Sequence, residues 1–384
     1  MPDLEKRLRD RLAELDVAGL RRSLRTPAGV DLSSNDYLGL AEHPTLVRHM
    51  AETLAREGCG STASRLLRGH REGFTSLERK FAAFKGTESA LYFSSGYLAN
   101  IGVLATIPEE GDVVFSDELN HASLIDGMRL SRARRVVFPH RDVAALSALL
   151  HEERGARHKF LVTESLFSMD GDEAPLGQYA DVCRAANTAL IVDEAHAVGV
   201  YGKRGSGLIE EAGIGEAVFL SVNTAGKALG VGGALAAGPA WAIDYLIQRA
   251  RSFIFSTAPP PAMAAALEAA LELVETEPGR RTQLLRNAGL LRDLLVREGL
   301  RVPRGRSQII PVVLGDNDRA VAASDALGEQ GFDVRAIRPP TVPAGTARLR
   351  ISVNSKADEA TLRRFAVTLA QTMTRITPCS VVSS

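Results

Sequence analysis

The stretch TALIVDEAH, residues 188–196, decides the fold class of this chain. It is a continuous apolar run that ends in polar residues, as is typical of a parallel strand buried on both faces. Five runs of the same kind occur around it: SALYFSS (89–95), DVVFSD (112–117), RRVVFPH (134–140), KFLVTES (159–165) and AVFLSVNT (217–224). Helical patterns separate these runs, so we expect an α/β fold with a mostly parallel, doubly wound sheet. Polar residues at the carboxyl ends of its strands should line a ligand crevice.

Weaker patterns flank this central region. Leucines at positions 4, 8, 12 and 15 have helical spacing, which predicts an amphipathic N-terminal helix that docks on the body or on a partner subunit. Residues 262–298 are strongly helical but break at Pro278-Gly279, where we place the start of a smaller α+β domain. The expected division is an N-terminal helix and connector (1–43), a large domain (44–277) and a small C-terminal domain (278–384). In the small domain, SQIIPVVLGD, FDVRAIR and ARLRISVN are expected strands, and helices are expected over 318–330 and 357–375.

Composition excludes several classes of protein. The 384 residues are 45% hydrophobic and 24% charged, which suits a globular protein with a sizeable core. Basic and acidic residues number 46 each, so the net charge favours neither nucleic acid nor an acidic membrane surface as a partner. The three cysteines, at 59, 183 and 379, are too far apart for a metal site, and we expect no metal. There is no membrane-spanning run or signal peptide, and we expect a cytoplasmic protein.

Lys227 is the most unusual of the seven lysines. The other six lie in polar or helical surroundings, whereas Lys227 follows an apolar strand and precedes the small-residue stretch ALGVGGALAAG. A lysine in a desolvated crevice has a lowered pKa and becomes a useful amine. The alternative is a lysine at a strand end whose head reaches water, and this feature alone does not separate the two.

Asp193 and His196 belong to the VDEAH motif, which ends a buried strand. The carboxylate of Asp193 could pair with a pyridinium nitrogen and His196 could reach a phenolic oxygen, as pyridoxal phosphate requires beside a Schiff-base lysine. Asp193 could instead cap a helix. The letters DEAH also match a helicase motif, but the phosphate-binding loop that a helicase needs is missing from the sequence.

Two further stretches favour a phosphate-bearing cofactor. SSGYLANIGVL (94–104) reads as a strand end, a glycine turn and a helix start, where Ser95, Gly96 and Tyr97 could hold a phosphate with Thr224 as a hydroxyl donor. His121, in NHASLIDG, could stack on a flat ring, although a lone histidine is more often structural. GCGSTA (58–63) formally matches a dinucleotide fingerprint, but a helical pattern precedes it where a strand is required, so we discount an NAD dehydrogenase.

Together these motifs resemble the α-oxoamine synthases, a branch of the fold-type I pyridoxal-phosphate enzymes, whose large domain is similar to that of aspartate aminotransferase. The resemblance extends from SSNDYLGL (33–40) to ARLRISV (347–353). Within the family, the chain is most similar to the branch that acts in biotin biosynthesis. That similarity rests on SRLLRG (64–69), SLFSMDGDEAPL (165–176), VDEAHAVGVYG (192–202) and IRPPTVPAGTARLR (337–350).

The resemblance implies a role for each matching residue. Lys227 would carry pyridoxal 5'-phosphate as a Schiff base and move the α-proton, Asp193 would pair with the ring nitrogen, and His121 would stack on the ring. The remaining implied cofactor contacts are His196 and Ser168 on the phenolic side, Ser95, Gly96, Tyr97 and Thr224 around the phosphate, and Ser256 and Thr257 toward the phosphate of a neighbouring subunit. Substrate contacts would come from Arg338 or Arg350, which would hold a carboxylate, and from Asn35 and Arg21.

The implied reaction is the decarboxylative condensation of L-alanine with a pimeloyl thioester of coenzyme A or a carrier protein, in a homodimer. Thr62, Ala63 and Ala197 depart from the residues usual in the family and could alter pocket width. Three alternatives stay open: a sister synthase with glycine or another acyl group, an aminotransferase, and a non-catalytic binding protein on the same scaffold.

Overall fold

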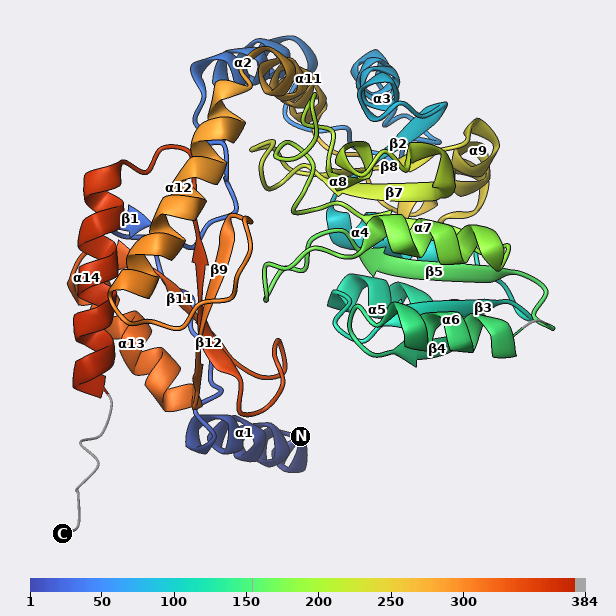
Figure 1. Ribbon diagram of the computed structural model, residues 1–384. Coiled ribbons are helices and arrows are strands. Elements are labelled where there is room, and N and C mark those ends of the chain that lie inside the picture. The colour runs from blue at the N-terminus through green and yellow to red at the C-terminus, as the bar shows by residue number, and fades with distance from the viewer. Residues whose placement is uncertain (154, 377–384) are drawn as a thin grey trace. The chain divides into compact units, whose positions relative to one another are not determined.

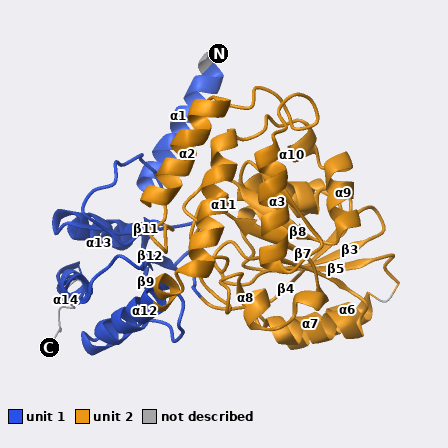
Figure 2. Ribbon diagram, turned by 90° about the horizontal axis from the view of Figure 1, so that it is seen from above, with its two compact units in different colours: residues 1–34, 169–171, 283–384 blue, residues 35–168, 172–282 orange. Residues whose placement is uncertain are grey.

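The computed structural model describes residues 1–153 and 155–376, and it divides into two compact units (Figures 1 and 2). Unit 1 comprises residues 1–34, 169–171 and 283–384, and unit 2 comprises residues 35–168 and 172–282. This division differs from the expected one at the N-terminus. Residues 1–34 group with the C-terminal region because β1 (Val30–Asp31) pairs in parallel with β10 (Phe332–Asp333). The tail from residue 377, which includes Cys379, lies outside the described residues.

Unit 2 is built on a seven-stranded sheet with the order β2-β8-β7-β6-β5-β3-β4. Its strands are β2 (Ser89–Phe93), β3 (Val113–Asp117), β4 (Arg134–Phe138), β5 (Lys159–Glu164), β6 (Ala189–Asp193), β7 (Val218–Thr224) and β8 (Ala234–Gly238). The six strands expected from the sequence are all present, and the neighbours among β3 to β7 are parallel. β8 was not expected, since its sequence ALAAG lacks β-branched residues. It runs antiparallel between β2 and β7.

Helices cover both faces of this sheet. Alternate strand residues such as Val114 and Val162 join one core cluster with α4 (Gly96–Leu104), α5 (Ala122–Leu130), α9 (Ala240–Arg249) and α10 (Arg251–Ile254). Tyr92 contacts Phe74 of α3 (Glu72–Lys85), and Phe138 contacts Tyr179 of α7 (Leu176–Ala185). The other helices of unit 2 are α2 (Pro44–Glu57), α6 (Val143–Glu152), α8 (Leu208–Glu211), the 3-10 turn Gly215–Ala217, and α11 (Pro261–Thr276), which packs on α2.

Unit 1 holds a three-stranded antiparallel sheet with the order β11-β12-β9. Its elements are α1 (Pro2–Val17), β9 (Ile309–Gly315), α13 (Asn317–Glu329), β10, β11 (Arg335–Ile337), β12 (Ala347–Ser352), α14 (Glu359–Ile376) and most of α12 (Gly279–Arg297). The helix break expected at Pro278-Gly279 falls between α11 and α12. The leucine stripe of α1 is 39% to 53% exposed in this chain.

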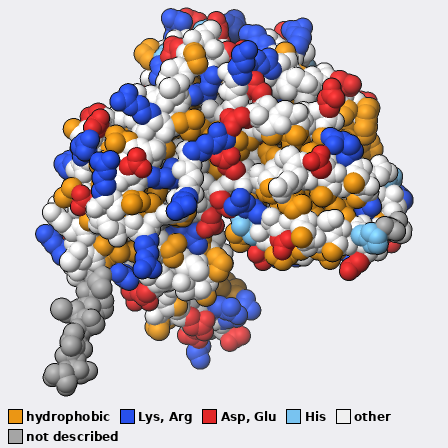
Figure 3. Space-filling model, viewed as in Figure 1, with side chains coloured by type: hydrophobic (Ala, Val, Ile, Leu, Met, Phe, Trp, Pro, Cys, Tyr) orange, Lys and Arg blue, Asp and Glu red, His pale blue; other side chains and the backbone are white. Residues whose placement is uncertain are grey.

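The carboxyl ends of the parallel strands meet at one edge of the unit 2 sheet, where β3, β5, β6 and β7 end at Asp117, Glu164, Asp193 and Thr224. Polar side chains therefore gather there, as the sequence pattern indicated. On the face seen in Figure 3, basic and acidic side chains are interspersed, in keeping with their equal numbers. Among the described residues, no helix is long and apolar enough to cross a membrane.

Candidate active site

Asp193 is held in place as a buried carboxylate at the end of β6. Its Oδ2 accepts a hydrogen bond of 2.7 Å from Nδ2 of Asn100, and its Oδ1 accepts one of 2.8 Å from the backbone N–H of Ala195. The residue is 6% exposed. A carboxylate with both oxygens positioned in this way is a preformed partner for a cationic ring nitrogen.

Lys227 lies in the bend between β7 and β8. Its Nζ is 2.9 Å from Nε2 of His196, whose Nδ1 is 2.6 Å from the hydroxyl of Tyr37. That hydroxyl donates a 3.0 Å hydrogen bond to Oδ1 of Asn35. With the Tyr37 proton directed at Asn35, His196 donates from Nδ1 to Tyr37 and its Nε2 accepts from Lys227. The three residues thus orient the amine.

The turn before α4 forms an anion cradle. Ser95 caps the helix by accepting a 3.2 Å hydrogen bond from the N–H of Leu98. Among the described residues, no hydrogen bond is recorded for the backbone N–H groups of Gly96 and Tyr97, which suits an anion at a helix N-terminus. A Cβ on Gly96 would lie only 2.4 Å from Oγ1 of Thr224. Glycine is therefore required for the hydroxyl of Thr224 to approach this turn.

Tyr97 contributes to this cradle through its backbone. Its side chain is 43% exposed, and its hydroxyl donates to the carboxylate of Asp126. The sequence placed Tyr97 beside a phosphate, and the orientation of the phenol leaves the peptide N–H as the group for that role.

His121 is linked to Asp193 through two polar side chains. Its Nδ1 is 2.7 Å from Oγ of Ser123, which accepts a 2.9 Å hydrogen bond from Asn100. Burial lowers the pKa of His121. The negative charge of Asp193 acts to raise this pKa and the positive charge of Lys227 acts to lower it, and the net shift is downward. The imidazole is therefore neutral near pH 7, in the form suited to stacking on a ring or to donating one hydrogen bond.

Glu164 is a further ionisable group at this edge, and sequence reasoning missed it. It lies beside Asp193 in the sheet register, and its Oε1 accepts a 2.7 Å hydrogen bond from the backbone N–H of His121. Burial, and then the charge of Asp193, raise the pKa of Glu164 to about 8, although Lys227 and the His121 N–H oppose the rise. The sequence could have identified Glu164 by its position at the carboxyl end of an expected strand. No comparable signal marked Tyr37, Asn100 or Ser123.

The arginines predicted to bind substrate all lie in unit 1. Arg350 is buried on β12, where its guanidinium donates to Oγ of Ser352 at 2.7 Å. Arg338 donates to the backbone carbonyls of Gly19 and Arg21, at 2.5 and 3.2 Å. The side chain of Arg21 forms an exposed ion pair with Asp16. Arg338, which follows β11, thus contacts the connector after α1 that carries Arg21.

Ser168 and Thr257 occupy loops of unit 2. Ser168 is partly buried in the turn after β5, and Thr257 is exposed after α10. Their predicted contacts with the cofactor remain predictions.

The residues at the carboxyl edge suit pyridoxal phosphate. An amine, a buried carboxylate and a glycine turn with available N–H groups match the aldehyde, the ring nitrogen and the phosphate of that cofactor. No group of three or more potential metal ligands occurs among the described residues.

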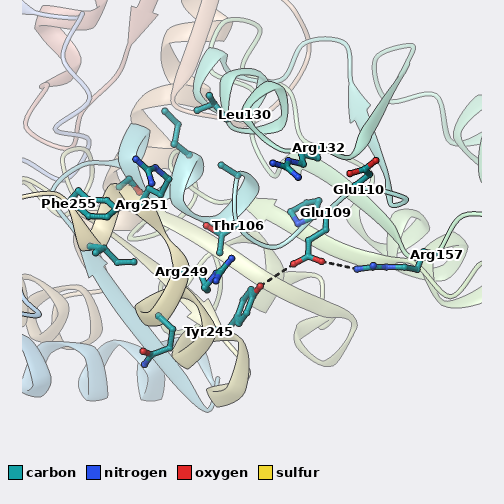
Figure 4. A pocket seen from close by; sticks show the side chains of 16 residues that line it. Thr106, Glu109, Glu110, Leu130, Arg132, Arg157, Tyr245, Arg249, Arg251 and Phe255 are labelled. Carbon is teal, nitrogen blue, oxygen red and sulfur yellow. Dashed lines mark hydrogen bonds and ion pairs between the residues drawn. The ribbon is translucent and has the colours of Figure 1, made fainter.

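A large open pocket lies elsewhere in unit 2, around the ends of α4, α9 and α10 (Figure 4). Its volume is about 1120 Å³, and the basic side chains along it are Arg132, Arg157, Arg249 and Arg251. Figure 4 shows Glu109 between Tyr245 and Arg157, with hydrogen bonds to both. None of the predicted cofactor residues lines this pocket, so the candidate active site is defined by its chemistry and not by cavity size.

Fold and site together define a pyridoxal-phosphate enzyme of the aminotransferase fold. The family model for class I and II aminotransferases matches residues 27–369. The 8-amino-7-oxononanoate synthase of Geobacter sulfurreducens is 47% identical, over 94% of this chain and 96% of its own length. That of Anaeromyxobacter dehalogenans is 48% identical, over 96% and 95%. The chain belongs to the 8-amino-7-oxononanoate synthases, within the class I and II aminotransferase family.

Solved structures agree with this assignment. Serine palmitoyltransferase from S. paucimobilis, solved with bound pyridoxal phosphate and myriocin, is 27% identical with a TM-score of 0.90, over 96% of this chain and 97% of that one. The 8-amino-7-oxononanoate synthase from Francisella tularensis is 30% identical with a TM-score of 0.78, over 90% and 98%. The predicted fold class and cofactor are thereby confirmed.

Proposed function

We propose that this enzyme condenses L-alanine with a pimeloyl thioester, releasing carbon dioxide and a free thiol and forming 8-amino-7-oxononanoate for biotin biosynthesis. The observation that carries the proposal is the joint placement of Lys227, Asp193 and the Gly96 cradle at one sheet edge. The names of relatives that are 47% to 48% identical support the particular reaction.

Pyridoxal phosphate, when bound, supplies an electron sink for the carbanion formed at the α-carbon of the amino acid. The carboxylate of Asp193 would form an ion pair with the ring nitrogen of the cofactor, and the amine of Lys227 would bond to the aldehyde carbon of the cofactor. Gly96, Tyr97 and Thr224 would hold the phosphate, and His121 would stack on the ring. His196 and Ser168 would bond the phenolic oxygen.

Lys227 is the proposed base for the α-proton of the amino acid. The amine of Lys227 lies beside His196, whose Nε2 accepts from Nζ and thereby orients the lone pair that would take the proton. Tyr37 and Asn35 fix the imidazole in turn. Neutral His121 can donate a hydrogen bond to the oxyanion that develops when the thioester is attacked.

The substrate carboxylate is assigned to Arg338 or Arg350, the two arginines that the family resemblance offers for it. The guanidinium of Arg338 donates to two backbone carbonyls of the connector, and that of Arg350 donates to the hydroxyl of Ser352. Replacing the arginine that holds the carboxylate by lysine should raise KM for the amino acid and leave KM for the thioester nearly unchanged. Asn35 and Arg21 are proposed as further contacts of the substrate region.

Thiol release from pimeloyl-CoA by the cofactor-loaded enzyme tests the proposal, with L-alanine and glycine in parallel. Release that depends on alanine supports it. Release with glycine alone would assign the enzyme to a sister synthase. If neither amino acid supports release, the same assay with a pimeloyl carrier protein decides between another acyl donor and another reaction. Transfer of the amino group to a keto acid without thiol release would instead show an aminotransferase.

A further inference from the structure

The segment after β5, residues 165–174, forms a hairpin-like turn that carries Ser168. The N–H of Ser165 donates to the carbonyl of Asp193 at 2.8 Å, and the N–H of Ala174 donates back to the carbonyl of Ser165 at 3.0 Å. The N–H of Phe167 donates to the carbonyl of Asp172 at 3.0 Å. One end of the turn is thus attached to the backbone of Asp193.

His140 connects this turn to the end of β3. Its Nδ1 is 2.8 Å from Oδ1 of Asp117, and its Nε2 is 2.8 Å from Oδ2 of Asp172. The ring lies edge-on to Phe167, with 4.4 Å between the centroids. The Asp117 side chain is fully buried, and that of His140 is 19% exposed. One imidazole therefore joins a rigid strand end to both sides of the turn.

Both ring nitrogens of His140 face carboxylate oxygens. A neutral imidazole has a single N–H and would direct a lone pair at one of the two carboxylates, so only the imidazolium makes both hydrogen bonds. Burial alone lowers the pKa of His140, but the hydrogen bonds to Asp117 and Asp172 outweigh it and raise the pKa to about 9. Geometry and electrostatics agree on a doubly protonated ring at neutral pH.

The charged groups around the ring come from every element packed against it. Arg141 donates to Oδ2 of Asp117 through its backbone and to Oδ2 of Asp172 through its guanidinium, at 3.0 and 2.9 Å. Glu118 accepts the backbone N–H of His140 at 2.9 Å. Asp142, two residues after His140, is the N-cap of α6. The buried phenol of Tyr179 on α7 is close enough to feel the charges of Asp117, Arg141 and Asp172. Arg141 and the protonated ring of His140 thus partly balance these carboxylates, and loss of the His140 proton makes the cluster more negative by one charge.

We propose that His140 is a positioning residue, whose cationic ring holds the 165–174 turn and thereby places Ser168 for the cofactor. This rests on the proposed function only for the role of Ser168. Since the pKa of the folded group lies above its ordinary 6.5, its stabilisation is complete below pH 6.5 and is lost as the pH rises through about 9.

The first test uses the cofactor-free protein. With ¹⁵N-labelled histidine, NMR should show both nitrogens of His140 protonated at pH 7.5, and Asp172→Asn should lower the pKa of His140 by at least one unit.

Hydrogen exchange of the 165–174 peptide, corrected for intrinsic rates, should be at least tenfold faster in His140→Gln than in the wild type at pH 7.5. At pH 10 the two proteins should exchange at the same rate. His151→Gln, an exposed histidine on α6, is the control. A neutral His140 at pH 7.5 or unchanged exchange would overturn the proposal.

The second test measures thiol release against pH. The wild type should show an alkaline limb near pH 9. His140→Gln should lower kcat, leave KM for the thioester within twofold, and remove that limb. An unchanged kcat would refute the positioning role even if the exchange result held. If the wild type releases no thiol from any donor, the proposed function fails, and the NMR and exchange results still decide whether the ring holds the turn.

Discussion

Lys227 is the residue on which the chemistry depends most directly. Lys227→Ala removes both the amine that would bind the cofactor and the proposed base, so multiple turnover should fall by more than about a thousandfold, since loss of a base alone costs roughly 10²- to 10⁴-fold. Lys203→Ala, an exposed lysine of the same unit, should retain full activity. Thiol release over many turnovers is the measurement, and appreciable turnover by Lys227→Ala would refute the assignment.

Glu164 gives the folded protein a pH dependence of its own. Burial raises its pKa from 4.5 to about 8, so the folded state holds a proton that the unfolded chain releases near pH 4.5. The contribution of this proton to stability is largest below pH 4.5 and declines as the pH rises to about 8. Glu164→Gln keeps the acceptor for His121 but cannot ionise.

The Tm of the cofactor-free Glu164→Gln variant, relative to wild type, should therefore rise between pH 5 and pH 8.5. For Glu42→Gln, at an exposed residue, the difference in Tm from wild type should stay constant with pH. A flat difference for Glu164→Gln as well would mean that its carboxyl ionises normally in the folded protein.

Gly96 tests the anion cradle. In Gly96→Ala the new Cβ would lie 2.4 Å from Oγ1 of Thr224, and overpacking of this kind costs about 1–3 kcal/mol of folding free energy. We expect cofactor affinity to fall at least tenfold. The double variant with Thr224→Ala should recover stability in urea but not affinity, because the hydroxyl donor is gone. Normal stability of the single variant would show that the turn can shift.

Elements were predicted well where one pattern determined them. The six runs that begin at residues 89, 112, 134, 159, 188 and 217 are all strands, and the polar ends of β2, β5, β6 and β7 contribute to the candidate site. β8 was missed, since ALAAG is a strand only because β2 and β7 offer it hydrogen bonds on both sides. Tyr37 and Asn100 were missed for a similar reason: their partners, His196 and Asp193, are distant in sequence.

A buried ion pair holds α3 to the segment that follows β6. Nζ of Lys85 donates to Glu194 at 2.5 Å and to the carbonyl of Ser206 at 2.6 Å, and both charged side chains are at most 2% exposed. Glu194→Gln leaves the lysine cation unpaired, and breaking such a pair costs about 3–5 kcal/mol. Because Glu194 follows Asp193 directly, the loss should also loosen the candidate site.

Urea unfolding of the cofactor-free protein measures this cost. Arg363→Gln, which removes an exposed ion pair with Glu359, should cost under about 1 kcal/mol. The double variant Lys85→Met, Glu194→Gln should be more stable than Glu194→Gln alone, because no unpaired cation remains. A cost below about 1 kcal/mol for Glu194→Gln would indicate that water reaches the lysine.

The division of the whole molecule into units depends on contacts that no local pattern shows. Residues 1–34 belong to unit 1 through contacts such as those of β1, whose two partners on β10 are about three hundred positions away, and those of Arg338 with Gly19 and Arg21. A connector rich in turns gives no sign of such a pairing. The break at Pro278-Gly279, in contrast, was readable because it interrupts a long helical pattern, and the unit boundary falls four residues further on, at 282.

A homodimer with shared active sites is the prediction at the scale of the molecule. The pocket in Figure 4 exposes Leu130 and Phe255, by 64% and 72%, among four arginines. Exposed aromatic and aliphatic side chains mixed with arginine are typical of a protein interface. Phe255 also directly precedes Ser256 and Thr257, which are proposed to reach the phosphate of the neighbouring subunit. We therefore expect a second copy of the chain to cover this pocket.

Light scattering should give about twice the chain mass of 41.1 kDa for the wild type. Phe255→Asp should produce monomers that have lost most thiol release, because a buried unpaired carboxylate would oppose assembly. Val367→Asp, at an exposed valine of α14, should remain dimeric and active. A monomeric wild type with full activity would refute the shared site. A Phe255→Asp variant that stays dimeric would place the interface on another face, and Thr257 would then have no subunit to reach.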